Sequence, residues 1–148
     1  MGIRKYIARD FPDISEIYSH SKLDELINEK SEFSLIPLNK DNKRLQILMA
    51  SDIYVYTEQN IIGYGGYNNR EITALFVHPE HRGRGVGIAL LEFLISKIPS
   101  HAYLYVAKSN IAAITLYRKH EFEIVDEFQA EYNGIPVLAN KMIRSSTG

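Results

Sequence analysis

The chain has 148 residues, 45% of them apolar, so it is long enough to bury a substantial core and short enough to form a single domain over residues 1–148. Its formal net charge of −1 argues against a nucleic-acid or membrane-surface partner. Because cysteine is absent, disulfides, thiolate metal sites and a cysteine nucleophile are excluded. No apolar run approaches the length of a membrane span and no signal-peptide core begins the chain, so we expect a cytoplasmic protein.

The first fifty residues are expected to be mainly helical. Weak alternation predicts a first strand from Ile3 to Ala8, and Asp10 then stands where a helix cap is useful. Apolar residues recur at helical spacing through residues 12–29, which predicts one helix or a broken pair. Residues 31–50 give a weaker pattern, with a further helical turn or two near their end.

From Ile53 onward the apolar period changes to two, which is typical of strands. Residues 53–56 and 61–67 are predicted to form a hairpin, and residues 68–70 turn the chain again into a strand over residues 71–77. The result is an antiparallel meander that ends at a glycine-rich loop.

After this loop the chain is predicted to alternate between helix and strand. Pro99 ends a helix whose core-facing residues are Val86, Leu90, Leu91, Leu94, Ile95 and Ile98. Residues 102–107 form the next strand, which a helical crossover makes parallel to the strand ending at Val77. Either Ser109 or Asn110 caps a further helix, and residues 123–132 and 136–143 form a last hairpin around Asn133-Gly134. The tail from Ser145 to Gly148 is expected to fray.

The glycine-rich loop, residues 82–88, has the features of a pyrophosphate site. Its glycines at 83, 85 and 87 let the backbone turn tightly, so that successive N–H groups approach an anion without a Cβ in the way. The helix that begins there adds its positive dipole end and its unpaired amides. The spacing fits neither a Walker loop, which ends in Gly-Lys-Ser/Thr, nor the dinucleotide fingerprint.

Two motifs in register resemble those of the GNAT superfamily of N-acyltransferases, which bind acetyl-CoA. The first is Arg82-x-x-Gly85-x-Gly87 after a strand, and the second is the segment from Ser109 to Phe122 with Asn110 and Tyr117. The resemblance covers roughly residues 61–143. It implies a mixed α/β (α+β) fold, in which a mostly antiparallel twisted sheet of six to seven strands contains a parallel, splayed central pair and is flanked by about four helices.

The resemblance also implies how acetyl-CoA is held. The pantetheine arm enters between the splayed strands and pairs with the main chain of residues 75–77, the pyrophosphate rests on the loop amides, and the oxyanion sits on an N–H near Val77. Asn110 hydrogen-bonds the pantetheine region. The residues expected to contact acetyl-CoA are Leu75, Phe76, Val77, Arg82, Gly83, Arg84, Gly85, Val86, Gly87, Ile88, Asn110 and Tyr117.

Two residues are candidates for the chemistry. By resemblance, Tyr117 offers its phenol to the CoA sulfur as general acid, although a tyrosine with a pKa near ~10 protonates a thiolate of pKa ~8.5 only at a cost of about 2 kcal/mol. Glu71 opens the strand that ends at Val77, and it matches the general base of some protein-lysine acetyltransferases in the superfamily. The alternatives are a core aromatic for Tyr117 and an exposed strand-end carboxylate for Glu71.

Two positions depart from the pattern of the superfamily. Bacterial N-terminal acetyltransferases carry a glutamate where this chain has Tyr105, which argues against that substrate class. Glu121 replaces the usual glycine after the helix that carries Tyr117, which costs about 1 kcal/mol and shifts the left-handed turn to His120 or Glu121.

His78 and His81 are two histidines on a loop, which are far more often solvent-facing than metal-bound, so we expect no metal. The leading functional hypothesis is transfer of an acetyl group from acetyl-CoA to a primary amine of a small molecule, peptide or protein by direct attack in a ternary complex. The alternatives are a non-catalytic acyl-CoA sensor and a tRNA-directed acetyltransferase toxin, which the near-zero charge disfavours. The resemblance places the acceptor between the early helices and the last hairpin; a homodimer is left open.

Overall fold

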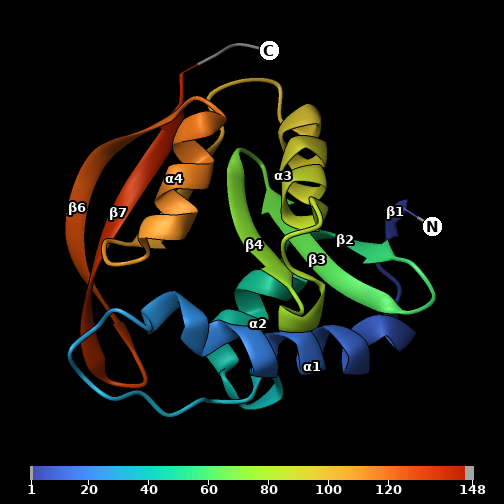
Figure 1. The fold of residues 1–148 in the computed structure, drawn as a ribbon, viewed down its shortest axis with the longest axis horizontal. Coiled ribbons are helices and arrows are strands. Elements are labelled where there is room, and N and C mark those ends of the chain that lie inside the picture. Colours follow the sequence, from blue (N-terminus) through green and yellow to red (C-terminus); the bar gives the residue numbers. More distant parts are fainter. Residues whose placement is uncertain (1, 146–148) are drawn as a thin grey trace.

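The computed structural model describes residues 2–145, so part of the predicted C-terminal tail, residues 146–148, lies outside the described residues. Seven strands form one sheet within this range, in the order β1-β2-β3-β4-β5-β7-β6 (Figure 1). The strands are β1 (Gly2–Lys5), β2 (Asp52–Thr57), β3 (Ile61–Asn68), β4 (Glu71–Val77), β5 (Tyr103–Ala107), β6 (Phe122–Tyr132) and β7 (Ile135–Arg144). The helices are α1 (Phe11–Ser21), α2 (Asn42–Met49), α3 (Val86–Lys97) and α4 (Ile111–Lys119).

All neighbouring strands are antiparallel except β4 and β5, which are parallel. The expected mixed α/β fold with a mostly antiparallel sheet is therefore confirmed. The predicted hairpins also form, and Asn110 rather than Ser109 caps α4, since its side chain accepts a hydrogen bond from the N–H of Ala113 at 3.4 Å.

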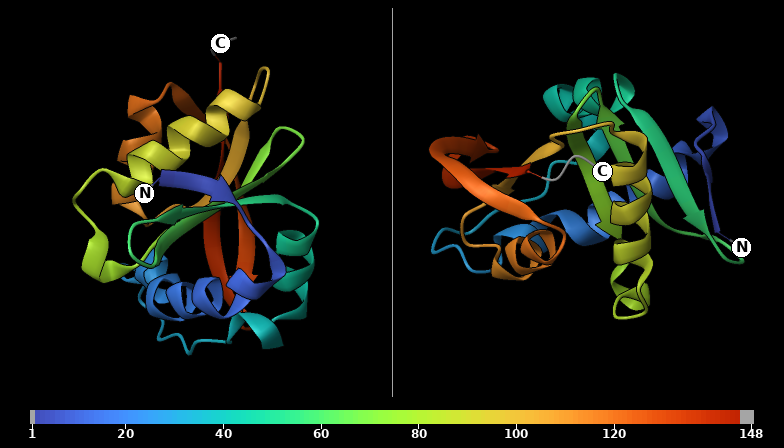
Figure 2. Two further views of the ribbon diagram at one scale, coloured as in Figure 1. Left: turned by 90° about the vertical axis from the view of Figure 1, so that its right-hand side faces the viewer. Right: turned by 90° about the horizontal axis from the view of Figure 1, so that it is seen from above.

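Helices cover both faces of the sheet, as the side and top views show (Figure 2). On one face, α1 and α2 pack on the central strands through a buried cluster. On the other face, α3 packs on β3 and β4, while α4 packs against β6. The predicted stripe of α3 is buried except at Ile95, which is partly buried. Gly65 permits this packing, because a Cβ there would lie 2.8 Å from Cδ1 of Leu94. No helix in residues 2–145 is both long enough and apolar enough for a membrane crossing.

The N-terminal strand is shorter than expected, and the prediction that it extends to Ala8 was wrong. It ends at Lys5 because Asp10 folds the chain into a short 3₁₀ turn, Ala8–Asp10. The Asp10 carboxylate accepts a hydrogen bond from the N–H of Ile7 at 2.9 Å and two from Arg4 at 2.8 and 2.9 Å. The prediction that the Asp10 side chain caps α1 was therefore wrong, because Asp10 makes no side-chain cap hydrogen bond to this helix. Residues 12–29 form the broken pair that the sequence allowed, α1 followed by a 3₁₀ turn at Lys22–Leu26.

This buried carboxylate gives a prediction for stability. Hydrogen bonds from Arg4 hold the pKa of Asp10 below its usual value, although burial opposes them. A lowered pKa means that the stabilisation is complete above the unfolded-state pKa of about 3.9 and is lost as the pH falls through the folded-state value. We expect Asp10→Asn to lower the free energy of unfolding by about 2 kcal/mol at neutral pH. In urea titrations this difference should shrink on acidification, and the exposed control Asp13→Asn should lose less than about 1 kcal/mol.

The end of α4 confirms the expected left-handed turn at a residue other than glycine. Glu121 has φ +72°. Its side chain pairs with Arg144 at 3.4 Å, but the Glu121 carboxylate is largely exposed, so the pair contributes little. We therefore expect Glu121→Gly to raise the free energy of unfolding by about 0.5 kcal/mol, because glycine adopts this conformation without a steric penalty. A decrease in urea titrations would show that the ion pair outweighs the backbone strain.

Candidate active site

The parallel strands at the centre of the sheet separate almost at once. Only Glu71 and Tyr103 are paired between β4 and β5. β5 continues alongside β7 over its whole length, and β4 continues alongside β3. The facing edges of β4 and β5 are therefore without strand partners beyond the first pair, as expected for a splayed pair.

The register between β3 and β4 shows which main-chain groups face this gap. The N–H of His78 donates to the carbonyl of Ile62 at 2.9 Å, so the next hydrogen-bonded pair along the antiparallel ladder is Phe76 with Tyr64. The N–H and C=O groups of Leu75 and Val77 alternate with these and point toward β5. Of the three residues expected to bind pantetheine, Leu75 and Val77 present their amides to the gap, whereas the Phe76 amide is used within the sheet.

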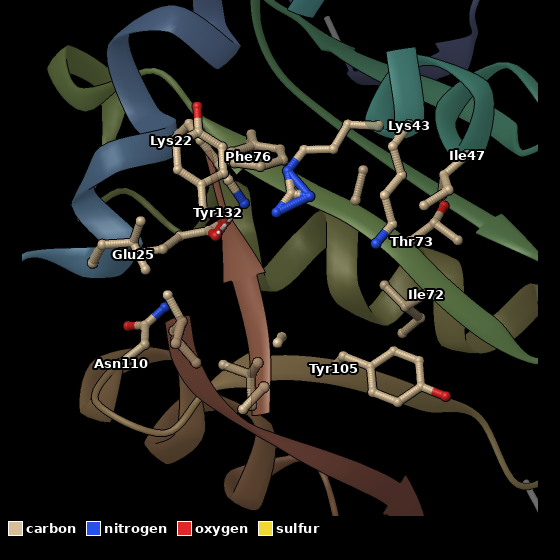
Figure 3. A pocket seen from close by; sticks show the side chains of 18 of the residues that line it. Lys22, Glu25, Lys43, Ile47, Ile72, Thr73, Phe76, Tyr105, Asn110 and Tyr132 are labelled. Atoms are coloured by element: carbon tan, nitrogen blue, oxygen red, sulfur yellow. Dashed lines mark hydrogen bonds and ion pairs between the residues drawn. The ribbon is translucent and has the colours of Figure 1, made fainter. Parts of the chain in front are cut away.

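A cavity of about 1020 Å³ lies at this separation. Its lining combines residues of β4 and β5 with residues of α1, α2, α4 and the last hairpin. Figure 3 shows Lys22, Phe76 and Tyr132 gathered on one side of the cavity, with Tyr105 and Asn110 on the opposite side. Of the residues singled out from the sequence, the cavity brings together Glu71, Phe76, Asn110 and Tyr117.

Glu71 is half-buried and lines the cavity at the paired end of β4. Burial raises its pKa above the usual value, and the positive charge of Lys141 opposes this shift. The carboxylate is therefore a stronger base than an exposed glutamate, and it is not the fully exposed strand-end group that was the alternative.

Tyr117 and Asn110 reach the cavity from α4. Asn110 uses its side-chain oxygen to cap the helix, which leaves its NH₂ group as a donor. Burial raises the pKa of Tyr117 well above its usual value, so the phenol is a weak acid and keeps its proton as a hydrogen-bond donor. Its ring also packs on Phe122, with 5.9 Å between centroids, so Tyr117 is partly a core aromatic as well.

The glycine-rich loop lies outside the lining of the cavity, at the start of α3. Gly83 and Gly85 have φ values of +77° and +82°, the left-handed conformation that glycine adopts without strain. Gly85 is the N-cap residue of α3 and no side chain caps this end. The first amides of α3 are thus free to bind an anion, as expected for residues 83–88.

Both loop arginines are engaged by carboxylates in this structure. Arg82 contacts Asp24 at 2.7 Å and donates through Nε to the carbonyl of Val77 at 3.2 Å, while Arg84 contacts Glu58 at 2.7 Å. These pairs are exposed, and exposed pairs are weak, so either guanidinium can exchange its carboxylate for a phosphate at little cost.

No sequence pattern pointed to several cavity residues on the far side of the gap from the loop. Tyr18 was identified only as part of a helical stripe, and Lys22, Arg44 and Tyr132 were not singled out at all. The resemblance placed an acceptor pocket between the early helices and the last hairpin, but it named no residues there.

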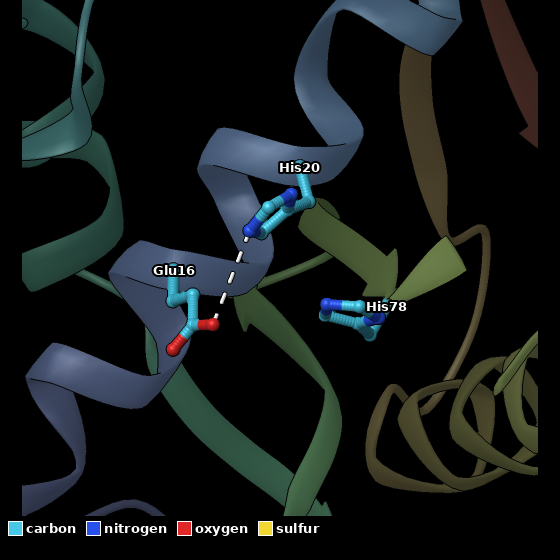
Figure 4. A group of neighbouring side chains, drawn as sticks. All are labelled: Glu16, His20 and His78. Atoms are coloured by element: carbon cyan, nitrogen blue, oxygen red, sulfur yellow. Dashed lines mark ion pairs between the residues drawn. The ribbon is translucent and has the colours of Figure 1, made fainter. Parts of the chain in front are cut away.

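One cluster among the described residues has metal-ligand geometry. Glu16 and His20 on α1 lie beside His78, and the ligand atoms of the three are within 4.8 Å of one another (Figure 4). Glu16 and His20 are exposed, and Nδ1 of His78 already accepts a hydrogen bond from the N–H of Glu80 at 3.1 Å. The absence of a metal stays a prediction.

Comparison with known proteins agrees with this geometry. A family model described as the acetyltransferase (GNAT) family matches residues 3–122. The chain belongs to the GNAT acetyltransferase family. An acetyltransferase of Pectobacterium atrosepticum is 36% identical over 85 residues, a stretch that covers 51% of this chain and 60% of the relative.

Solved structures of GNAT proteins share the fold. A GCN5-related N-acetyltransferase from Rhodopseudomonas palustris superposes with a TM-score of 0.79 at 18% identity, covering 97% of this chain and 94% of that one. A phosphinothricin acetyltransferase from Sinorhizobium meliloti, solved in complex with AcCoA, gives a TM-score of 0.71 at 22% identity, covering 96% and 86%. At these identities the likeness shows the GNAT fold alone.

Proposed function

We propose that this protein transfers an acetyl group from acetyl-CoA to a primary amine by direct attack in a ternary complex. The observation that carries the proposal is the single pairing between β4 and β5, which leaves the amides of Leu75 and Val77 facing the gap between these strands, beside a cavity lined by Glu71 and Tyr117. The uncapped start of α3 supplies an anion site for the pyrophosphate. The acetyl-CoA complex of a GNAT structural neighbour supports this choice of donor.

Each step of this reaction is assigned to a group in the cavity or beside it. An alkylammonium has a pKa near ~10.4 and must lose a proton before it attacks, and Glu71 is placed to accept it directly or through water. The amine nitrogen then bonds to the thioester carbon. The oxyanion that forms is stabilised by the N–H of Val77, the attacking nitrogen gives its second proton to solvent, and the carbon–sulfur bond breaks to release the CoA thiolate.

Tyr117 is proposed to hold the departing sulfur. Because burial raises its pKa, proton transfer from the phenol to a thiolate is more unfavourable than the reference values suggest. A hydrogen bond that strengthens as negative charge builds on sulfur avoids this cost. Tyr117 therefore stabilises and orients the leaving group, and solvent supplies the proton afterwards.

A screen of amines with acetyl-CoA, monitored by thiol release, tests this function. We expect release that depends on both the protein and the amine. Tight binding of acetyl-CoA without release for any amine would support the sensor alternative instead. A basic groove for tRNA is not indicated, because the cavity lining contains as many acidic as basic residues.

A further inference from the structure

The side of the cavity beneath α1 and α2 contains two buried polar groups without partners. Three buried side-chain nitrogen or oxygen atoms in the described part of the chain have no hydrogen-bond partner, and two of them, the Tyr18 hydroxyl and Arg44 Nε, belong to residues that line this cavity. Tyr18 is only 3% exposed. An unpaired buried group costs about 1–3 kcal/mol, so a partner from outside the chain is favoured.

Arg44 forms an ion pair with Asp41 but makes no side-chain hydrogen bond among the described residues. Its guanidinium carbon lies 5.0 Å from the centroid of the Tyr132 ring. Its nearest carboxylate, Asp41, is 3.7 Å from Nε, beyond hydrogen-bond distance, and the other oxygen of Asp41 accepts from the main-chain N–H of Arg44 at 3.3 Å. The planar guanidinium is thus pre-oriented, and no side-chain hydrogen bond from it occurs among residues 2–145.

Two lysines of the cavity lining, balanced by carboxylates elsewhere in it, lie near these groups, and Tyr18 contacts the strand of the proposed reaction centre. Lys22, itself paired with Glu25 at 2.8 Å, lies 5.5 Å from the centroid of the same Tyr132 ring. Lys43 extends into the cavity from α2 (Figure 3). The Tyr18 ring meets Phe76 of β4 edge to face, with 5.4 Å between centroids. Tyr18 therefore contacts a side chain of the strand on which the thioester is proposed to lie, and Arg44 lines the same cavity from α2.

We propose that Tyr18 and Arg44 form a subsite for a carboxylate on the acceptor, so that the acceptor is an amine that also carries a carboxylate. This inference rests on the proposed acetyl transfer and names its substrate class. A guanidinium matches the two oxygens of a carboxylate, and its single charge matches the single charge of that group. The Tyr18 phenol, whose pKa burial raises, stays protonated and adds a third donor. An acceptor with only an amine is disfavoured here, because it would leave the Arg44 guanidinium and the Tyr18 hydroxyl without a hydrogen-bond partner.

Matched acceptors test the proposal directly. We would compare each L-amino acid with its carboxamide, and short peptides with free and amidated C-termini as a second arm, by thiol release from acetyl-CoA. The carboxylate member should react about 10²-fold faster in kcat/KM. Comparison of the amino acids with the peptides shows whether the carboxylate comes from a free amino acid or from the C-terminus of a chain.

Variants locate the effect. We expect Arg44→Gln to lower kcat/KM for the carboxylate acceptor by about 10²-fold, and Tyr18→Phe to lower it by about tenfold. For the matching carboxamide, kcat/KM should change by less than about threefold in both variants. Arg70→Gln is the matched control, because Arg70 also stacks on a tyrosine, Tyr103 at 5.6 Å, and neither of these two residues lines the cavity. Two results would contradict the subsite: an equal loss of kcat/KM for a carboxylate acceptor and its carboxamide, or an Arg44 variant that still prefers the carboxylate acceptor.

A binding measurement separates this proposal from the proposed function. N-acetyl amino acids and their carboxamides are titrated into the protein loaded with CoA and followed by calorimetry. Binding of the acids that requires Arg44 supports the subsite even if no amine is turned over. If amines that lack a carboxylate give thiol release and no N-acetyl amino acid gives binding heat, the proposed acetyl transfer stands and the carboxylate subsite is rejected.

Discussion

Glu71→Gln is expected to reduce kcat/KM for the amine acceptor by on the order of 10²-fold near pH 7, with the loss growing at lower pH and shrinking toward about pH 9. The ammonium form of the acceptor dominates at low pH, so removal of its proton depends most on Glu71 there. In the variant, the rate should follow the fraction of free amine and approach the wild-type rate as that fraction rises. A pH profile of thiol release measures this directly.

The wild-type profile carries a second expectation, whose sign follows from the raised pKa of Glu71. Activity should fall as the pH drops through that raised value, because protonated Glu71 cannot accept the proton. Burial of the ionised carboxylate also destabilises the folded state above this pKa, so Glu71→Gln should leave the melting temperature unchanged or raise it. Glu131→Gln, another carboxylate of the cavity lining, is the control. Parallel profiles for wild type and Glu71→Gln would assign Glu71 a structural part only.

Tyr117→Phe is expected to lower kcat by about 10–10²-fold and to change the KM for acetyl-CoA by less than about threefold. The hydroxyl is proposed to contact sulfur only as negative charge develops, so its loss should affect the chemical step more than binding. Initial rates at saturating acceptor provide the measurement.

A second phenol in the same cavity serves as the control. Tyr105 lines the cavity on β5 and is 49% exposed, so Tyr105→Phe should leave kcat within about threefold. An unchanged kcat in Tyr117→Phe would remove its chemical role and leave a core aromatic packed on Phe122.

The fold was predictable from the sequence where local chemistry dictates structure. The glycine spacing from 83 to 87 and the apolar stripe of α3 indicated a strand, a tight glycine turn and a helix, and all three are present, while anion binding by the loop stays a prediction. The end of β1 was not predictable from alternation alone, because it depends on Asp10 accepting hydrogen bonds from Arg4. The position at which β1 ends therefore depends on the side chain of Asp10, which lies outside the strand.

The acceptor side of the cavity was hidden for a different reason. Tyr18 and Tyr132 are 114 positions apart, and both are buried, so each reads in the sequence as an ordinary core residue. Arg44 lies on a short helix whose pattern was weak. Only the folded chain shows that Tyr18 and Arg44 line the same cavity, each with a buried polar atom that has no hydrogen-bond partner among the described residues.

The account depends most on the main-chain amides of β4 and of the loop before α3 holding the donor. An amide NMR titration of the ¹⁵N-labelled protein with acetyl-CoA tests this most directly. We expect the largest shift changes at Leu75, Val77 and residues 83–88, with smaller ones at Phe76, whose N–H pairs within the sheet. Unchanged amide resonances at these positions under excess acetyl-CoA would contradict the account.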